Sequence, residues 1–376
     1  MIYRQAGQPA TSALLLPKGG QEPGKRGEDT VTLKVGIIGC GSIATHRHAP
    51  EYSSNPYTQI HLVYDPNPER AQKLAAQYGG QVAGSWEEVV HHPELAAISD
   101  CSTNEMHHII TTQALLAGKH VLCEKPMATT SEGAETILAA ARASGKILMV
   151  DHNQRLVPAH QKARQLIAAG ELGKILSFKT SFGHKGPEYW SANRTKGTWF
   201  FKKARSALGV AGDLGIHKVD LLRYLLQDEI VQVSAFADVL DKKDEQGQPI
   251  EVCDHMVCLL KTQSGAVGTA SFSWSYYGDE DNSTILYGER GIMKIFADPQ
   301  KDIEVVTAGG ERAVYQIGAM QTNDAQTKSG VIDAFVEAIR TGTAPAVTGE
   351  DGLYALRIIE AAMESVATGR SVELFV

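Results

Sequence analysis

A carboxylate and an imidazole that share one face of a predicted helix are the first residues here with the chemistry of proton transfer. Asp213 and His217 are four positions apart, which places them one turn apart on a helix expected over residues 212–226. A carboxylate beside an imidazole fixes its tautomer and raises its pKa, which suits a group that takes and returns a proton near neutral pH. A histidine on a helix face is also a common structural residue, and the spacing alone leaves both interpretations open.

A lysine in a proline-containing turn adds an electrophilic group. Lys125 lies between Glu124 and Pro126, directly after a short apolar run predicted to be a strand. The carboxyl ends of strands in an open α/β sheet border the ligand crevice, so the ammonium of Lys125 is expected to reach a bound ligand. The alternative is a surface lysine in a loop. Another predicted strand end leads into further polar side chains expected at the same edge, namely Ser102, Asn104 and His107.

A glycine-rich turn joins the first predicted strand to a helical segment. Gly39, Gly41 and Ala44 have the spacing G-x-G-x-x-A. The first glycine permits a tight turn, the second lets a pyrophosphate approach the backbone, and the alanine lets the helix pack closely on the strand. The helix N-terminus, at Ser42 and Ile43, then faces the anion. This turn predicts a dinucleotide site.

Asp65 ends the second predicted strand, about 20 residues after Ala44, where a carboxylate binds the ribose hydroxyls of adenosine. Because a carboxylate there repels a 2′-phosphate, the sequence favours NAD over NADP, although Arg70 nearby softens that preference. The alternative for Asp65 is a plain turn residue before two prolines.

The segment that positions these residues alternates short apolar runs with helical patterns, which is typical of a parallel, doubly wound sheet. Strands are expected at 32–38, 60–64, 96–101, 120–123 and 147–150, with helices at 68–78, 105–117 and 131–143. Hydrophobicity then alternates with period two from 230 to about 315, which predicts an antiparallel sheet. Further helices are expected at 158–169, 212–226, 330–340 and 351–367.

Composition excludes several classes of protein. The 376 residues are 43% hydrophobic and 21% charged, as in folded globular proteins, and the net charge of −7 argues against nucleic acid as a partner. No apolar run is long enough to span a membrane. Five scattered cysteines without a CxxC pair predict neither disulfides nor a thiolate metal site, and they favour a reducing cytoplasm. Residues 1–30 are interpreted as a flexible extension or as an arm on a neighbouring subunit.

The order of these motifs resembles the Gfo/Idh/MocA family of oxidoreductases, which includes inositol and sugar dehydrogenases. The motifs are G-x-G-x-x-A, an aspartate after the second strand, S-x-N-x-x-H, A-G-K-H-V-L-C-E-K-P and G-D-L-G-x-H-x-x-D. The resemblance spans roughly residues 33–376. It implies an α/β chain with a Rossmann NAD-binding domain over 31–151. Residues 152–376 would form an α+β domain with a large, mainly antiparallel sheet that binds substrate and builds a homodimer or homotetramer.

The resemblance also implies the roles of individual residues. Lys125, Asp213 and His217 correspond to the family's catalytic group, and no metal is required. The cofactor is expected at the glycine turn and the strand ends, namely Gly39, Gly41, Ser42, Ile43, Asp65, Ser102, Asn104, His107, Glu124 and Lys125. The substrate is expected at Lys125, Asp213, His217, His184, Trp190, His152, Asn153 and Arg155. Asp151 to Arg155 depart from the family's usual Gly-aromatic start, so His152 and Asn153 are expected to face the nicotinamide or the sugar.

The reaction expected is reversible oxidation of a secondary hydroxyl on a cyclic polyol or sugar. His217 takes the hydroxyl proton, Lys125 hydrogen-bonds the reacting oxygen, and Asp213 polarises His217, although the lysine and histidine can exchange their parts. Trp190 and Trp199 either contact the ring or anchor a long loop. Two other functions stay open: an NAD-recycling glycoside hydrolase or lyase of the same family, and a non-catalytic sugar or dinucleotide sensor.

Overall fold

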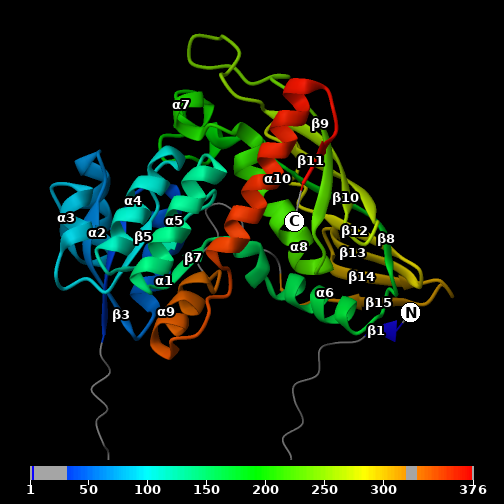
Figure 1. Ribbon diagram of the computed structural model, residues 1–376, viewed down its shortest axis with the longest axis horizontal. Helices are drawn as coiled ribbons and strands as arrows, with labels where there is room; N and C mark the ends of the chain where they lie inside the picture. The colour runs from blue at the N-terminus through cyan, green and yellow to red at the C-terminus, as the bar shows by residue number, and fades with distance from the viewer. Residues whose placement is uncertain (1, 4–31, 319–327, 375–376) are drawn as a thin grey trace, which may run out of the picture.

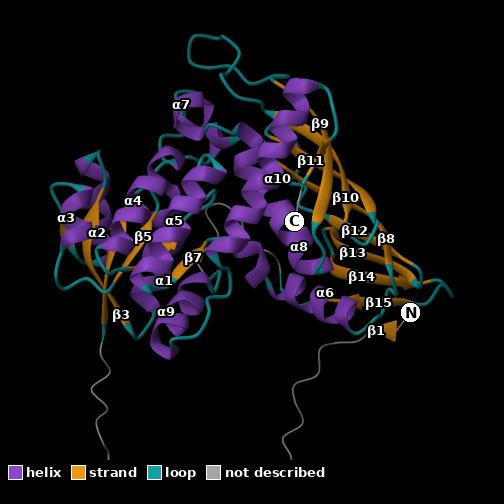
Figure 2. Ribbon diagram, viewed as in Figure 1, coloured by secondary structure: helices purple, strands orange, loops and turns teal. Residues whose placement is uncertain are grey.

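Two sheets organise the molecule, which is described here by a computed structural model for residues 2–3, 32–318 and 328–374. They lie side by side, with helices packed between them (Figures 1 and 2). This arrangement confirms the expected fold class, a Rossmann domain followed by a domain with a large, mainly antiparallel sheet.

The first sheet has six parallel strands in the order β4-β3-β2-β5-β6-β7. Strand order reverses between β2 and β5, so the crevice beyond their carboxyl ends is the topological switch point where such sheets bind ligands. The strands are β2 (Leu33–Ile38), β3 (Thr58–Tyr64), β4 (Gln81–Val82), β5 (Ala97–Asp100), β6 (His120–Cys123) and β7 (Leu148–Val150). The helices are η1 (Ala44–His48), α1 (Ala49–Ser54), α2 (Pro68–Tyr78), α3 (Trp86–His91), α4 (Asn104–Leu116) and α5 (Ser131–Ser144).

Local sequence explains where these helices begin and end. Asn67 accepts a hydrogen bond from the Glu69 amide at 3.0 Å, and Pro68 occupies the first position of α2, where a missing N–H costs nothing. Thr130 caps α5 through the Gly133 amide, and Gly145 ends the same helix with φ +65°. The predicted strands and helices of this domain are therefore confirmed, with ends shifted by one or two residues.

The second sheet has ten strands in the order β1-β15-β14-β13-β12-β8-β11-β10-β9-β16. Helices α6, α8 and α10 pack on the face that is turned toward the first domain (Figure 1). The strands are β1 (Ile2–Tyr3), β8 (Ile175–Gly183), β9 (Ile230–Asp238), β10 (His255–Thr262), β11 (Val267–Ser273), β12 (Thr284–Gly288), β13 (Gly291–Asp298), β14 (Lys301–Thr307), β15 (Arg312–Tyr315) and β16 (Val372–Glu373). The helical segments are η2 (Asn153–Leu156), α6 (Pro158–Ala168), η3 (Pro187–Tyr189), η4 (Trp199–Phe201), α7 (Lys203–Ser206), η5 (Ala211–Gly215), α8 (Ile216–Leu226), α9 (Val331–Thr341) and α10 (Gly349–Thr368).

One central strand of this sheet departs from the sequence expectation. β8 lies outside the stretch predicted to form the sheet, yet it pairs parallel with β11 and antiparallel with β12. Its inward side chains, Phe178 and Phe182, are buried, whereas the outward Lys179 is exposed. Polar and apolar residues are therefore mixed along β8. Its position in the sheet depends on pairing with strands that are distant in the sequence, and the tertiary fold decides that pairing.

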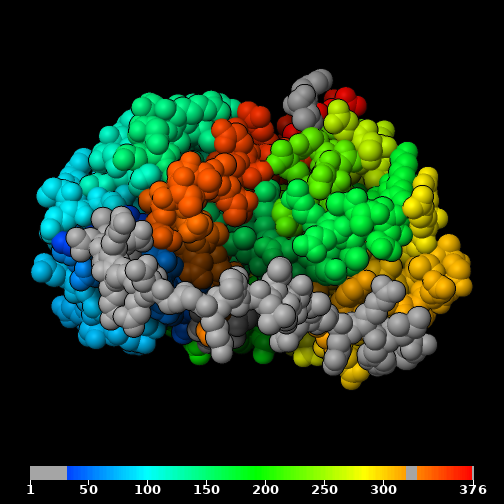
Figure 3. Space-filling view, turned by 90° about the horizontal axis from the view of Figure 1, so that it is seen from below, coloured from blue at the N-terminus to red at the C-terminus, as the bar shows by residue number. Residues whose placement is uncertain are grey.

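The chain returns to the first domain near its C-terminus. The Glu51 carboxylate of α1 accepts hydrogen bonds from the amide and hydroxyl of Ser329, at 2.6 and 2.7 Å. In the view from below, residues 328–350 (orange) lie against the blue and cyan surface of the first domain (Figure 3). The expected extension at 1–30 lies outside the described residues except for Ile2–Tyr3, which pair parallel with β15.

None of the helices in the described ranges is both long and apolar enough to cross a membrane.

Candidate active site

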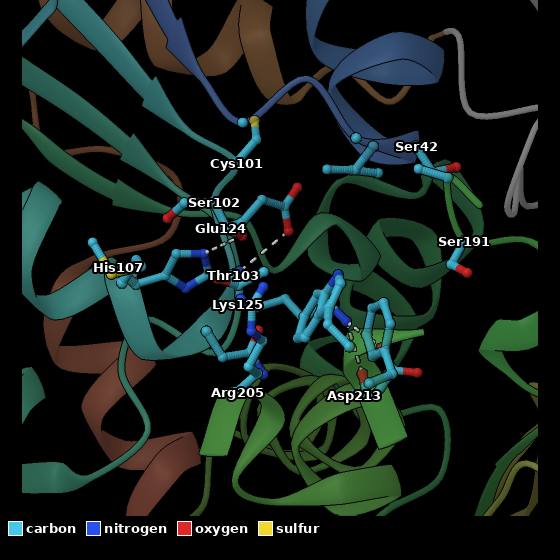
Figure 4. A pocket seen from close by; sticks show the side chains of 18 of the residues that line it. Ser42, Cys101, Ser102, Thr103, His107, Glu124, Lys125, Ser191, Arg205 and Asp213 are labelled. Carbon is cyan, nitrogen blue, oxygen red and sulfur yellow. Dashed lines mark hydrogen bonds and ion pairs between the residues drawn. The ribbon is translucent and has the colours of Figure 1, made fainter. Parts of the chain in front are cut away.

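A cleft of about 540 Å³ lies between the two domains, at the carboxyl ends of β2, β3, β5 and β6. Both domains line it, and Figure 4 shows Lys125 and Glu124 of the first domain together with Asp213 of the second. Most residues expected at the site line this cleft, namely Gly39, Gly41, Ser42, Ile43, Asp65, Ser102, Asn104, His107, Glu124, Lys125, Asn153, His184, Trp190, Asp213 and His217. His152 and Arg155 are outside the lining.

The glycine turn has the backbone that its sequence requires. Gly39 has φ +90°, and a Cβ added there would lie 2.2 Å from the Cys101 carbonyl oxygen, so no larger residue fits. A Cβ added at Gly41 would meet no atom within 4 Å, which leaves its backbone open to the cleft. The following helical turns run from Ser42 through the π-helical segment η1.

Asp65 stands at the end of β3, beside this turn. One carboxylate oxygen accepts a hydrogen bond from the Cys40 amide and the other from the Asn67 amide, both at 2.8 Å. The nearest guanidinium nitrogen of Arg70 is 3.9 Å from the carboxylate. A rigid, oriented carboxylate that lines the cleft, an open glycine and a helix N-terminus together fit the ribose and pyrophosphate of NAD.

Two alanine substitutions separate the structural and ligand-facing roles of this turn. We expect Gly39→Ala to lower the melting temperature, because its methyl group would collide with the backbone at Cys101. We expect Gly41→Ala to keep the wild-type melting temperature but to weaken NADH binding by about tenfold, because its methyl group enters the cleft. Differential scanning fluorimetry and NADH fluorescence titration measure these two effects. Unchanged NADH affinity in the folded Gly41 variant would contradict the assignment.

Lys125 is held by the second domain. Its ammonium donates to the Asp213 carboxylate and to the Asp213 backbone carbonyl, both at 2.9 Å. The other carboxylate oxygen of Asp213 accepts a hydrogen bond from the indole N–H of the fully buried Trp274, also at 2.9 Å. Both oxygens of Asp213 are therefore engaged, and the lysine is fixed at the cleft. The peptide bond between Lys125 and Pro126 is cis.

The expectation that Asp213 polarises His217 is wrong in this structure. The carboxylate of Asp213 is bonded to Lys125 and Trp274, and the buried His217 Nδ1 atom has no hydrogen-bond partner within the described part of the chain. Burial, with the positive charge of Lys125 and the proximity of His152, lowers the pKa of His217 well below its ordinary value. The π-helical segment η5, which contains Asp213, alters the helical phase between the two residues. His217 is therefore neutral at pH 7.

Two further histidines are buried beside His217. The centroid of the His152 ring lies 6.2 Å from that of the His217 ring, and neither nitrogen of His152 bonds any residue in the described ranges. Burial lowers the pKa of His152, and it lowers that of His184 to about 4. The ring of Trp190 lies 6.1 Å from that of His184. The second domain thus presents neutral imidazoles and aromatic rings to the cleft.

Arg155 lies in a buried ion-pair network outside the cleft lining. Its guanidinium donates to both oxygens of Asp220, at 2.8 and 2.7 Å, and lies 3.0 Å from Asp351. The network joins α8, which carries His217, to α10. The guanidinium of Arg155 is therefore occupied by these two carboxylates, and its predicted contact with substrate stays a prediction.

A buried ionic group at the wall of the cleft joins Glu124, which the sequence predicted at the site, to Arg47, His48 and Asp151, which it did not. The carboxylate of Glu124 lies 2.5 Å from Arg47 and 2.9 Å from His48, and Asp151 lies 2.6 Å from Arg47. Burial opposes ionisation of Glu124, but the charge of Arg47 and the hydrogen bond with His48 hold its pKa well below the usual range. The three basic residues in T-H-R-H-A, just after the glycine turn, were the available signal.

The remaining predicted cofactor residues hold the strand-end loops. His107 contacts the carbonyl oxygens of Pro126 and Ser102, at 2.7 and 3.1 Å, and so ties the lysine turn to the neighbouring loop. The amide of Asn104 donates to the Ser206 carbonyl of the second domain at 3.2 Å. These contacts keep both loops at the cleft, and their predicted contact with cofactor stays a prediction.

Family models match both domains of the chain. Residues 33–152 match the model of an oxidoreductase family with an NAD-binding Rossmann fold, and residues 160–294 match the Gfo/Idh/MocA C-terminal domain. Levoglucosan dehydrogenase of Pseudarthrobacter phenanthrenivorans is 27% identical, across 89% of this chain and 96% of the relative. Myo-inositol 2-dehydrogenase of Thermotoga maritima is 26% identical, across 91% and 98%.

Solved structures agree over nearly the whole chain. A levoglucosan dehydrogenase in complex with NADH and levoglucosan superposes with a TM-score of 0.80 and 25% identity, covering 91% of this chain and 99% of that one. An aldose-aldose oxidoreductase from Caulobacter crescentus in complex with glycerol gives a TM-score of 0.77 and 27% identity, with 91% and 100% covered. The match of both domains, together with the glycine turn and the Lys125, Asp213 and His217 cleft, shows that the chain belongs to the Gfo/Idh/MocA family of oxidoreductases.

Proposed function

We propose that this protein is an NAD-dependent dehydrogenase that reversibly oxidises a secondary hydroxyl of a cyclic polyol or sugar. The observation that carries the proposal is the cleft itself, in which an anchored ammonium and a neutral imidazole lie beside a dinucleotide-binding turn. Relatives named as levoglucosan and inositol dehydrogenases support the substrate class.

His217 and Lys125 have separate roles in the proposed reaction. His217 accepts the proton of the substrate hydroxyl, since its lowered pKa leaves the imidazole neutral and ready to act as a base. Lys125 donates a hydrogen bond to the same oxygen and stabilises the negative charge that develops there. When bound, NAD accepts the hydride from the carbon that carries this oxygen.

Asp213 acts on the lysine in this scheme. Its carboxylate and carbonyl oxygens take hydrogen bonds from the ammonium of Lys125, and its second carboxylate oxygen is held by Trp274. An ammonium whose direction is fixed before the reaction does not have to reorganise as charge develops. Asp213 therefore orients the group that polarises the substrate.

The second domain supplies a wall suited to a polyhydroxylated ring. Trp190, Trp199, Phe200 and His184 line the cleft with Asn153. Aromatic faces pack against the C–H surfaces of a sugar ring, whereas imidazole and amide groups bond its hydroxyls. These groups would orient a small cyclic substrate in the cleft.

An absorbance assay tests the function. Purified protein is mixed with NAD and with each of myo-inositol, scyllo-inositol, glucose, simple glucosides, levoglucosan and sugar acids, and NADH is followed at its absorption maximum. We expect one or a few cyclic polyols to produce NADH. Binding of NADH without any turnover across this panel would contradict the proposed dehydrogenase.

Asp65 sets the preference between the two dinucleotides. We expect Asp65→Ser to raise kcat/KM with NADP by about tenfold and to lower it with NAD, because the carboxylate that repels a 2′-phosphate is removed while Arg70 stays beside it. Steady-state rates with both dinucleotides measure the change. Glu69→Ser, on the exposed first turn of α2, is the control and is expected to leave the ratio unchanged. An unchanged ratio in the Asp65 variant would contradict the assignment.

We also propose that the protein is a cytoplasmic homo-oligomer. The outward face of the second sheet exposes the cross-strand neighbours Phe236 and Val257, together with Leu259 and Val267, which makes it suitable for a second copy of the chain. All five cysteines are free thiols, which fits a reducing compartment. Sedimentation velocity and cell fractionation test the two points, and a monomer or a secreted protein would contradict them.

A further inference from the structure

Residues 191–198, here called the strap, cross the outer side of the cleft, and the proposed reaction assigns them no role. Ser191, Ala192, Asn193 and Thr198 line the same cavity as Ser42, Asp65 and Arg70 of the first domain. The part of the cleft that fits the dinucleotide therefore has a wall from the second domain as well.

Both ends of the strap are anchored. At the first end, the Ser191 amide bonds the Pro187 carbonyl at 2.8 Å, and the buried ion pair of Glu188 with Lys242 spans 2.6 Å. At the other end, the Phe200 ring packs edge-on against Trp190 and the buried Trp274, with ring centroids 4.9 and 6.4 Å apart. The residues between Ala192 and Gly197 are exposed. The strap is thus a loop with fixed ends and a tip that reaches across the cleft.

The tip contacts the first domain at the adenosine end of the cleft. The Arg70 guanidinium donates a hydrogen bond to the Asn193 side-chain carbonyl. The same guanidinium lies 3.9 Å from the Asp65 carboxylate that is expected to bind the ribose. Asn193 and Arg70 therefore bridge the two domains beside the ribose position.

Two hydroxyls at the ends of the strap have no hydrogen-bond partner among the residues that the structure describes. Ser191 is 5% exposed and Thr198 is 3% exposed, and the oxygen of each side chain is buried without a hydrogen bond. Buried hydroxyls are nearly always bonded, so each such atom on a cleft wall points to a ligand. Figure 4 places Ser191 on the same side of the pocket as Ser42, where the helix N-terminus suits a phosphate.

We propose that the strap completes the NAD site from the second domain. Ser191 and Thr198 hydrogen-bond the phosphate and ribose oxygens of the bound dinucleotide, and the contact of Asn193 with Arg70 latches the strap over it. This inference rests on the proposed function, since it assigns additional residues to the same cofactor. NADH then leaves only after the latch opens, so the strap sets its dissociation rate.

Stopped-flow fluorescence of NADH release tests the proposal independently of turnover. We expect Asn193→Ala, Ser191→Ala and Thr198→Val each to speed NADH dissociation by about fivefold, with unchanged melting temperatures. Arg70→Ala combined with Asn193→Ala is expected to dissociate no faster than Arg70→Ala alone, because both changes break one contact. Gln77→Ala, which removes an exposed amide from the same helix as Arg70, is the matched control and is expected to release NADH at the wild-type rate.

The possible outcomes distinguish failure of the strap proposal from failure of the proposed function. Wild-type dissociation rates in all three single variants, in a protein that binds and reduces NAD, would overturn the proposed role of the strap. They would leave the proposed dehydrogenase activity unaffected. A raised KM for the polyol with an unchanged NADH rate would assign the hydroxyls to the substrate and would also overturn it. A wild-type protein that binds no NADH would overturn the proposed function itself.

Discussion

Replacing Lys125 with methionine is expected to lower kcat by about three orders of magnitude while NADH still binds. The methionine keeps the length of the side chain but removes the ammonium that hydrogen-bonds the reacting oxygen. Because the charge on that oxygen grows in the transition state, the loss falls mainly on kcat. Steady-state oxidation of the substrate found in the absorbance panel, with an NADH fluorescence titration, measures the two effects.

The control for this substitution is Lys73→Met, an exposed lysine on α2, which is expected to retain wild-type turnover. The double variant Lys125→Met with Asp213→Asn should be scarcely slower than Lys125→Met alone, because Asp213 acts through the lysine. Near wild-type kcat in Lys125→Met would show that the ammonium does not polarise the substrate. Additive losses in the double variant would contradict the role given to Asp213.

Replacing His217 with alanine is expected to lower kcat by about two to four orders of magnitude, the range for loss of a general base. Added imidazole should restore part of the activity, because the substitution leaves room where the ring stood. His255→Ala, a half-buried position on β10 that does not line the cleft, is the control and should keep its rate with no response to imidazole. Full activity without imidazole would exclude His217 as the base.

The pH dependence of the wild-type enzyme follows from the same residue. A base works in its deprotonated form, so oxidation slows only when pH falls below the pKa of His217. Burial and the charge of Lys125 lower that pKa from its ordinary 6.5, so kcat/KM should stay level through pH 6.5 and fall at lower pH. An acidic limb above pH 6.5 would instead mean that a carboxylate raises this pKa. Asp213→Asn should reduce kcat/KM and leave the pH of the acidic limb unchanged.

Much of the fold can be predicted from local patterns in the sequence. The central strands of the first sheet are buried on both faces, so they read as continuous apolar runs, and Asn67 and Pro68 mark the start of α2. Strand β8 was missed because Lys179 and Thr180 interrupt its apolar pattern, and its neighbours β11 and β12 lie about 90 residues or more away. Such pairing is a long-range contact that a local pattern does not report.

The residues of the candidate site also divide into those that local sequence predicts and those that only the tertiary structure reveals. Gly39, Gly41 and Asp65 were found because backbone geometry and spacing demand them, and the structure brings them to one cleft with Lys125 and His217. The indole of Trp274 carried no such signal, and the basic residues around Arg47 did not reveal which carboxylates they contact. Their roles depend on partners far away in the sequence.

The sequence alone determined the order of elements, the dinucleotide turn and the identity of the ammonium, carboxylate and imidazole groups, because these depend on residue type and short spacing. Only the tertiary structure decided how these groups are paired. The spacing of four residues put Asp213 beside His217, whereas the fold turns the carboxylate to Lys125 and Trp274. Burial then leaves the imidazole neutral, since desolvation and a nearby ammonium both disfavour its charged form.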